Sequence, residues 1–201
     1  MKRIVLTGGP CAGKSSVLKA LQFEFAGQVL FVPEVATMLL SSGFPVPGKD
    51  VEWSLAWQAS FQKSVSTVQV QLENAYELMA QQMGIGLLVT DRGLMDGAGY
   101  TPGGQAEFCK IYKINLQKAL GRYVSVIHLE SLAVGKPELY GKNNNTNRFE
   151  ALDEAARLDF STREAWHGHP CWNFLPCSNG IEGNIAAVSA IVHECLKEVE
   201  M

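Results

Sequence analysis

The sequence lacks the features of membrane-spanning, secreted and nucleic-acid-binding proteins. None of its apolar runs reaches the roughly 20 residues that a transmembrane helix requires. Its 17 basic and 20 acidic residues give a net charge of −3, so no basic excess indicates nucleic acid or a polybasic membrane tether as a partner. No secretory signal precedes the first apolar segment, and the five cysteines are scattered and odd in number. We therefore expect a cytoplasmic protein with reduced thiols.

What is present is the composition of an ordinary globular protein. Charged residues make up 18% and hydrophobic residues 47% of the 201 positions, far from the composition of a disordered chain. The sequence contains no internal repeat and no long low-complexity linker. We expect one domain over residues 1–201, with a substantial core.

The most informative segment is residues 7–16, TGGPCAGKSS, which match the phosphate-binding pattern GxxxxGK[ST]. A β-branched segment at 2–6 precedes it, and apolar residues at helical spacing follow, as this motif requires. Backbone N–H groups of such a loop wrap a β-phosphate, Lys14 reaches the β- and γ-phosphates, and the Ser15 hydroxyl holds Mg²⁺. The expected nucleotide-binding residues are Gly8, Gly9, Pro10, Cys11, Ala12, Gly13, Lys14, Ser15 and Ser16.

The rest of the chain alternates between apolar strands and amphipathic helices. Further strands are predicted at 28–32, 85–90, 123–129 and 171–175. Continuous apolar strands between helices predict an α/β fold with a parallel sheet covered on both faces.

Helical spacing of apolar residues predicts long helices between these strands. Asp50 is expected to cap a helix over 51–82, with one apolar stripe at Val51, Leu55, Phe61, Val65, Val68, Leu72, Ala75 and Met79. Other helices are expected over 104–120 and 182–199. Another should begin at a capping box of Asn147 and Glu150 and stop at Gly168. Its apolar face is expected to hold Phe149, Leu152, Ala156 and Phe160.

Acidic and basic residues at the ends of predicted strands are candidates for chemistry. Asp91 ends the third strand, where a carboxylate can hold Mg²⁺ through water; alternatively it starts a turn before Gly93. Arg92 is expected either to bind a substrate phosphate or to hold the loop. Glu34 ends the second strand, and we expect it to accept a hydrogen bond or proton from an acceptor hydroxyl, or else to stabilise its own helix dipole. Asp96 either faces substrate or caps a loop.

Residues 135–165 are expected to form a mobile lid over the nucleotide, although the Asn-rich loop at 135–146 could be a passive surface loop. Arg148, Arg157 and Arg163 lie on or next to the helix of this lid. Arginines delivered by a lid neutralise charge on a transferred phosphoryl group. The alternative for two of them is a helix ion pair, Asp153 with Arg157 and Asp159 with Arg163.

Two other groups of residues are interpreted as structural. Trp53, Trp57 and Trp166 have helical spacing or helical context, which favours core and helix contacts over stacking on a base. The second group comprises His167, His169, Cys171 and Cys177. These residues do not have the spacing of a standard zinc site, and structural roles are favoured for them.

Taken together, TGGPCAGKSS, VPEVA, VTDRG and the segment RFEALDEAARLDFSTREAW resemble the AAA-type, nucleotide-kinase-like P-loop family along nearly the whole chain. This family includes a bacterial ribosylnicotinamide kinase domain and a GTP- and phosphoinositide-binding protein implicated in TRP-channel translocation. The resemblance implies a nucleoside-kinase-like three-layer sandwich with strand order 2-3-1-4-5 and a lid.

Two functions follow as hypotheses. In the first, the chain binds ATP or GTP with Mg²⁺ and transfers a phosphoryl group to the hydroxyl of a small-molecule acceptor. Lys14, Arg92 and the lid arginines would then act on the phosphoryl group, while Glu34 and Asp96 contact the acceptor. In the second, the chain is a nucleotide-dependent switch that hydrolyses slowly and recognises a partner or a lipid headgroup. The NKxD element of dedicated GTPases is absent from the sequence.

Overall fold

The computed structural model describes residues 1–140 and 151–200. Its five strands form one parallel sheet in the order β2-β3-β1-β4-β5, which confirms the predicted α/β fold and strand order. Three of the strands, β2, β3 and β4, begin two residues later than predicted. The strands are β1 (Lys2–Thr7), β2 (Leu30–Val32), β3 (Leu87–Asp91), β4 (Ser125–Leu129) and β5 (Trp172–Leu175).

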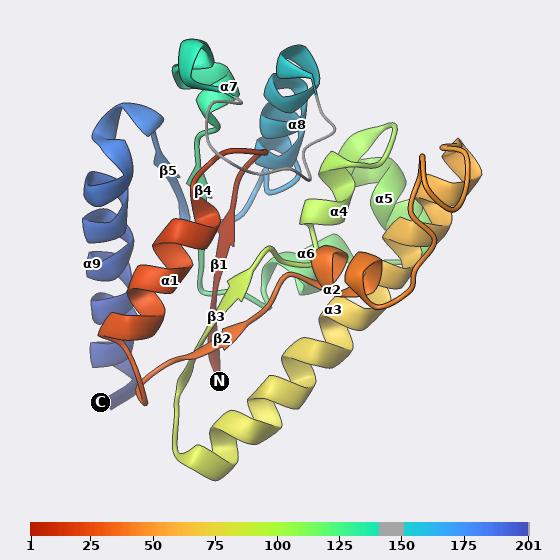
Figure 1. Ribbon diagram of the computed structural model, residues 1–201. Helices are drawn as coiled ribbons and strands as arrows, with labels where there is room; N and C mark the ends of the chain where they lie inside the picture. Colours follow the sequence, from red (N-terminus) through yellow and green to blue (C-terminus); the bar gives the residue numbers. More distant parts are fainter. Residues whose placement is uncertain (141–150, 201) are drawn as a thin grey trace.

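Helices cover both faces of this sheet (Figure 1). On one face, α1 (Lys14–Glu24) packs against α9 (Gly180–Glu200). The other face is covered by α3 (Leu55–Met83) and by a group of shorter helices. The described part also contains α2 (Val35–Ser41), α4 (Asp96–Gly99), α5 (Gly104–Tyr112), α6 (Leu116–Leu120), α7 (Leu132–Gly135) and α8 (Leu152–Glu164), with 3-10 turns at Pro137–Leu139 and Cys177–Asn179.

The core follows from the two-residue alternation of the strands. Ile4 and Leu6 of β1 are fully buried and belong to the cluster that packs against α1 and α9. Val5 points to the opposite face and packs in a cluster with Phe108 and Trp166. Each face of β1 therefore buries apolar side chains against helices. For this reason the strand has consecutive rather than alternating apolar residues.

The prediction for α3 was wrong in two respects. The helix is capped by Ser54, whose hydroxyl accepts a hydrogen bond from the Trp57 N–H at 3.1 Å, while Asp50 caps a preceding turn. Of the predicted apolar stripe only Phe61 is buried, whereas Leu55 is 63% and Met79 40% exposed. The buried positions of α3 are mostly polar, namely Phe61, Gln62, Ser66, Gln69, Glu73 and Ala80.

Two other helices also differ from the prediction. The segment at 104–120 forms two helices, α5 and α6, because Lys113 adopts a left-handed backbone with φ of 55° and ends α5. Helix α8 ends at Glu164 rather than at Gly168, and its predicted apolar face is wrong because Phe160 is 62% exposed. Its buried positions are Ala155, Leu158, Asp159 and Thr162. The predicted capping box of Asn147 and Glu150, and the nearby Phe149, lie outside the described residues.

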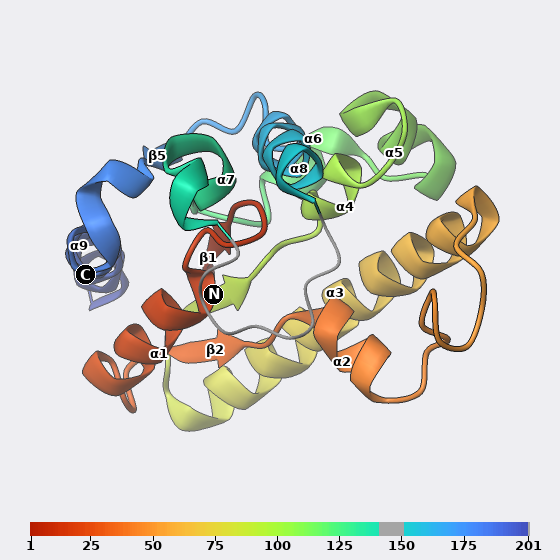
Figure 2. The ribbon, with the colours of Figure 1, turned by 45° about the horizontal axis from the view of Figure 1, so that its top comes forward.

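All candidate strand-end residues gather at one edge, because every strand of the sheet is parallel. Figure 2 turns this edge toward the viewer, and α2, α4, α7 and α8 surround the loop that joins β1 to α1.

Candidate functional site

The loop at residues 8–13 passes so close to β4 that its first position requires glycine. Gly8 has φ of +135°, and a Cβ added there would lie 2.2 Å from the carbonyl oxygen of Leu129. The loop ends at Gly13, after which α1 begins at Lys14. The N-terminus of α1 therefore lies directly after the loop, where its unpaired N–H groups and its dipole favour an anion.

Lys14 lies folded over the loop. Its Nζ donates hydrogen bonds to the carbonyl oxygens of Gly8 at 2.8 Å and Gly9 at 3.1 Å. Burial lowers the pKa of Lys14 to about 8, and the charge of Arg92 acts in the same direction. Asp91 opposes both effects. The ammonium group is therefore partly desolvated and held by weak neutral acceptors, which an anionic ligand can replace.

The residues expected to hold Mg²⁺ fit that ion. The Oδ1 atom of Asp91 is buried and, within the described part, has no hydrogen-bond partner. Burial, followed by the charge of Glu34, raises the pKa of Asp91 to about 6. An unpartnered carboxylate oxygen among like charges is stabilised by a hydrated divalent cation. Ser15 lies exposed in the first turn of α1, where its hydroxyl is available to a ligand.

Arg92 connects two carboxylates beside the loop. Its Nε donates to Glu34 at 2.6 Å and its Nη1 to Asp96 at 3.2 Å. Arg92 also has φ of 65°, a conformation that costs a non-glycine residue energy and that recurs at functional sites. Burial opposes its charge, but Tyr100, Glu34 and Asp96 keep the pKa of Arg92 well above its ordinary value.

The two carboxylates differ in their surroundings. Glu34 starts α2, where it also accepts a hydrogen bond from Thr37. Burial raises its pKa, but the charges of Arg92 and Lys14 outweigh this and lower the pKa of Glu34 to about 2. Asp96 is 3% exposed and accepts hydrogen bonds from four donors, in Thr7, Arg92, Gly93 and Trp166. Both Asp96 oxygens are thus occupied by donors from within the chain.

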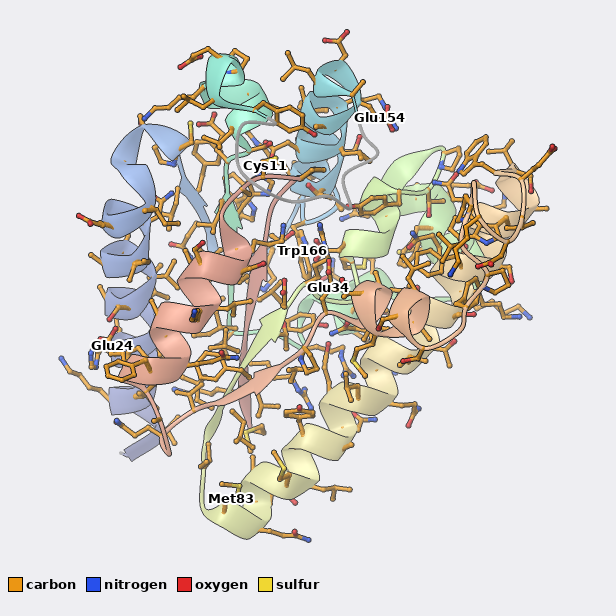
Figure 3. The ribbon with its side chains drawn as sticks, viewed as in Figure 1. Cys11, Glu24, Glu34, Met83, Glu154 and Trp166 are labelled. Atoms are coloured by element: carbon orange, nitrogen blue, oxygen red, sulfur yellow. The ribbon has the colours of Figure 1, made fainter. Side chains whose placement is uncertain are left out.

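A cavity of about 950 Å³ adjoins this cluster and extends between α2, α3, α4 and α8. Pro10 of the loop, Glu34 and Arg92 are among the residues that line it. Trp53, Leu55, Trp57, Phe61, Leu158 and Phe160 supply apolar lining. Figure 3 shows Cys11 on the loop above β1 and Glu34 at the start of α2. The volume lies within the range of about 300–1,000 Å³ that is typical of small-molecule sites.

Two of the three predicted lid arginines, Arg157 and Arg163, lie within the described residues and have different surroundings. Arg148 falls outside the described residues. Arg157 borders the cavity and pairs with Glu154 at 2.5 Å, not with Asp153. Arg163 does not border the cavity; its guanidinium group lies over the rings of Trp172 and Phe174, at 5.4 and 5.3 Å.

The tryptophans and the His and Cys residues that were interpreted as structural can now be placed. Trp166 is 1% exposed and packs in the core, as predicted, and Trp57 stacks on Phe61 at 5.0 Å. The prediction was wrong for Trp53, which is 60% exposed. The ring nitrogens of His169 lie 3.0 Å from the carbonyl oxygens of Cys171 and Tyr123, a structural role. Across the described residues, no group of three or more His, Cys, Asp and Glu side chains is arranged to hold a metal.

Two contributions were missed from the sequence. Gln62 lines the cavity although it is only 6% exposed, and no side-chain hydrogen bond joins its carboxamide to the described residues. Asp159 contacts the phosphate loop instead of pairing with Arg163. No local signal marks either residue, because each owes its position to helix packing rather than to a motif.

Comparison with known families agrees with this arrangement. A family model described as an AAA domain matches residues 3–180, which include the loop, the strand-end residues and α8. The chain belongs to this AAA domain family. As an AAA domain with a phosphate-binding loop, it binds nucleotide, and such domains usually bind it with Mg²⁺. No curated protein shows a significant match to the chain. None of the helices in the described ranges has the length and apolarity to cross a bilayer.

Proposed function

We propose that this AAA domain is a phosphotransferase that uses ATP or GTP with Mg²⁺ to phosphorylate a hydroxyl group of a small molecule. The observation that carries the proposal is the cavity beside the phosphate loop. It holds a carboxylate, Glu34, and a guanidinium, Arg92, at the end nearest the loop. A protein that only hydrolysed its nucleotide would need space for water there, not a cavity of about 950 Å³.

The residues around the loop have distinct roles in this proposal. Lys14 and the loop N–H groups bind the nucleotide phosphates. Ser15 and Asp91 would hold Mg²⁺, Asp91 through water, and the ion would neutralise part of the phosphate charge. Arg92 lies between the loop and the cavity, where it contacts the transferred phosphoryl group.

Glu34 orients the acceptor rather than removing its proton early. With a pKa of about 2, the carboxylate is ionised at neutral pH but is a weak base. Phosphoryl transfer proceeds through a loose transition state, in which positioning and electrostatics matter more than strong base catalysis. A hydrogen bond from the acceptor hydroxyl to Glu34 therefore suffices to aim its oxygen at the phosphoryl group. As the new O–P bond forms and the bond to the nucleoside diphosphate breaks, the hydroxyl proton passes late to Glu34 and from there to water.

The cavity favours an acceptor without a phosphate of its own. Only two cations, Arg92 and Arg157, are among its described lining residues, and both are assigned to the transferred phosphoryl group, which leaves neither for a phosphate on the acceptor. Aromatic walls and the unbonded Gln62 carboxamide suit an uncharged molecule with a flat apolar part.

The lid arginines are assigned by position. Arg148, which precedes α8 in the sequence and lies outside the described residues, is proposed to reach the transferred phosphoryl group. Arg157 borders the cavity and is proposed to contribute after releasing Glu154, an exposed and therefore weak ion pair. Arg163 lies over aromatic rings of β5, and we assign it a packing role.

Turnover with a panel of hydroxyl-bearing compounds tests the proposal. The protein would be incubated with Mg²⁺, with ATP or GTP, and with single acceptors, and phosphorylated products would be detected by mass spectrometry. We expect a product with at least one uncharged acceptor and none with Lys14→Ala. Gln62→Leu should raise the acceptor KM without changing the nucleotide KM, whereas Gln82→Leu, at an exposed position of the same helix, should change neither.

A panel without product would contradict the proposal if the protein bound nucleotide tightly and released phosphate only to water. Partner or phosphoinositide binding that differed between GTP and GDP would then support the nucleotide-dependent switch.

A further inference from the structure

Asp159 is a buried carboxylate that reaches the phosphate loop from a distant part of the chain. It lies on α8, is 4% exposed, and its Oδ1 accepts a hydrogen bond from the Gly9 N–H at 2.9 Å. The same oxygen accepts from the Ser131 N–H at 3.1 Å. One atom of α8 therefore joins the loop after β1 to the segment after β4.

The groups around Asp159 favour its ionised form. Nε2 of His128, a fully buried residue of β4, lies 3.3 Å from Oδ1. Burial raises the pKa of Asp159, but the contact with His128 and the two N–H donors outweigh it and leave the pKa below its ordinary value. Ser131 adds a second link, because its hydroxyl donates to the carbonyl oxygen of Pro10.

The loop fits against Asp159 without spare room. A Cβ added to Gly9 would lie 2.7 Å from the Asp159 Cβ and 2.9 Å from its Cα. The second position of the loop is therefore glycine because α8 occupies the adjacent space.

Helix α8 also borders the cavity through other residues. Leu158, Phe160 and Ser161, which flank Asp159 in the sequence, line it. The same two turns of helix thus touch the phosphate loop on one face and the cavity on another.

We propose that Asp159 is a positioning residue for the phosphate loop. It holds the loop in its binding conformation before nucleotide arrives, and it connects the loop to the wall of the cavity. This inference rests on nucleotide binding at the loop. A loop that is already ordered does not lose conformational entropy when it binds, so its affinity is higher than that of a loop that must be ordered by the ligand.

The variants that test this role differ in one feature each. Asp159→Ala removes the acceptor, and we expect it to weaken ATP or GTP binding about ten- to hundredfold. Asp159→Asn keeps an oxygen at the same place and should restore affinity to within about threefold of the wild type. Thr162→Val alters the same buried face of α8 without touching the loop, and Asp153→Ala removes an exposed charge from the same helix.

The measurements are the dissociation constants of Mg²⁺ with a fluorescent ATP or GTP analogue, the melting temperatures, and the amide spectrum of nucleotide-free protein labelled with ¹⁵N-glycine. We expect Thr162→Val to lower the melting temperature while keeping wild-type affinity. The Gly9 amide proton should move upfield in Asp159→Ala, because it loses a carboxylate acceptor, and should stay near its original position in Asp159→Asn.

The outcomes separate this inference from the proposed function. Wild-type affinity in Asp159→Ala, or affinity losses in Asp159→Ala and Thr162→Val that simply follow their melting temperatures, would overturn the positioning role alone. A wild-type protein that binds neither ATP nor GTP would overturn nucleotide binding at the loop, and the positioning role with it.

Discussion

Asp91→Asn should make the nucleotide-free protein more stable while removing Mg²⁺-dependent nucleotide binding. Asp91 ends β3 with a buried, unpartnered oxygen, and the charges of Glu34 and Asp96 act against its ionised form. Asparagine has nearly the same shape and no charge. The substitution therefore removes an unfavourable charge from the folded protein and a favourable one from the metal site.

The pKa shift of Asp91 sets the expected gain in the free energy of unfolding of Asp91→Asn. The carboxyl titrates at 3.8 in an ordinary environment and at about 6 in the folded protein. Between these values the folded state binds a proton that the unfolded state has released, so the free energy of unfolding falls as pH rises from about 4 to about 6. A shift of about two units corresponds to an upper limit of about 3 kcal/mol above pH 6. This shift already includes the attraction of Lys14, but the buried amide of asparagine needs hydrogen-bond partners of its own, which leaves an expected gain of about 1–2 kcal/mol.

Urea and thermal unfolding at pH 5.0 and 7.5, without nucleotide or metal, would measure this gain. At pH 7.5 the melting temperature of Asp91→Asn should exceed that of the wild type by about 3–6 °C, and the difference should shrink at pH 5.0. Asp153→Asn, at an exposed position of α8, serves as the control and should change stability little at either pH. A variant that is equally or less stable than the wild type at pH 7.5 would refute the assignment of Asp91 as a disfavoured buried charge.

Three further predictions concern the loop and its neighbours. Gly9→Ala should destabilise the fold by about 1–3 kcal/mol in urea unfolding, because its Cβ would meet Asp159, and an unchanged midpoint would contradict the close contact. Arg92→Lys should lower kcat about 10- to 100-fold with nucleotide affinity nearly unchanged, because an ammonium group cannot hold Glu34 and Asp96 in the geometry of the guanidinium; wild-type turnover would argue against this bridge. Nucleotide affinity should fall about tenfold between pH 7 and pH 9 in titrations, since the pKa of Lys14 is about 8 and the ammonium loses its proton. Lys14→Arg should flatten this pH profile, and an equal fall in that variant would place the titrating group elsewhere.

The parts of the site that follow a strand could be predicted from the sequence. The loop pattern fixes its own backbone geometry, and parallel strands bring Glu34, Asp91 and Arg92 to one edge wherever the helices lie. Local patterns therefore sufficed for these residues, whereas the strand order was predicted from the family resemblance.

The parts that depend on helix orientation could not be predicted. On α8, the predicted apolar face included Phe160, which is exposed. The face that is buried instead places Asp159 against the loop. On α3, Glu73 is fully buried because Arg122 and Tyr123 donate hydrogen bonds to it, a compensation that involves residues about 50 positions away. Hydrophobic periodicity assumes that a buried face is apolar, and it fails where buried polar groups have partners.

Transfer of label from [γ-³²P]ATP or GTP to uncharged hydroxyl compounds in the presence of Mg²⁺ tests the proposed phosphoryl transfer most directly. We expect labelled product that depends on the acceptor, disappears in Lys14→Ala and falls strongly in Arg92→Lys. Tight nucleotide binding with label released only as inorganic phosphate, whichever compound is supplied, would contradict it.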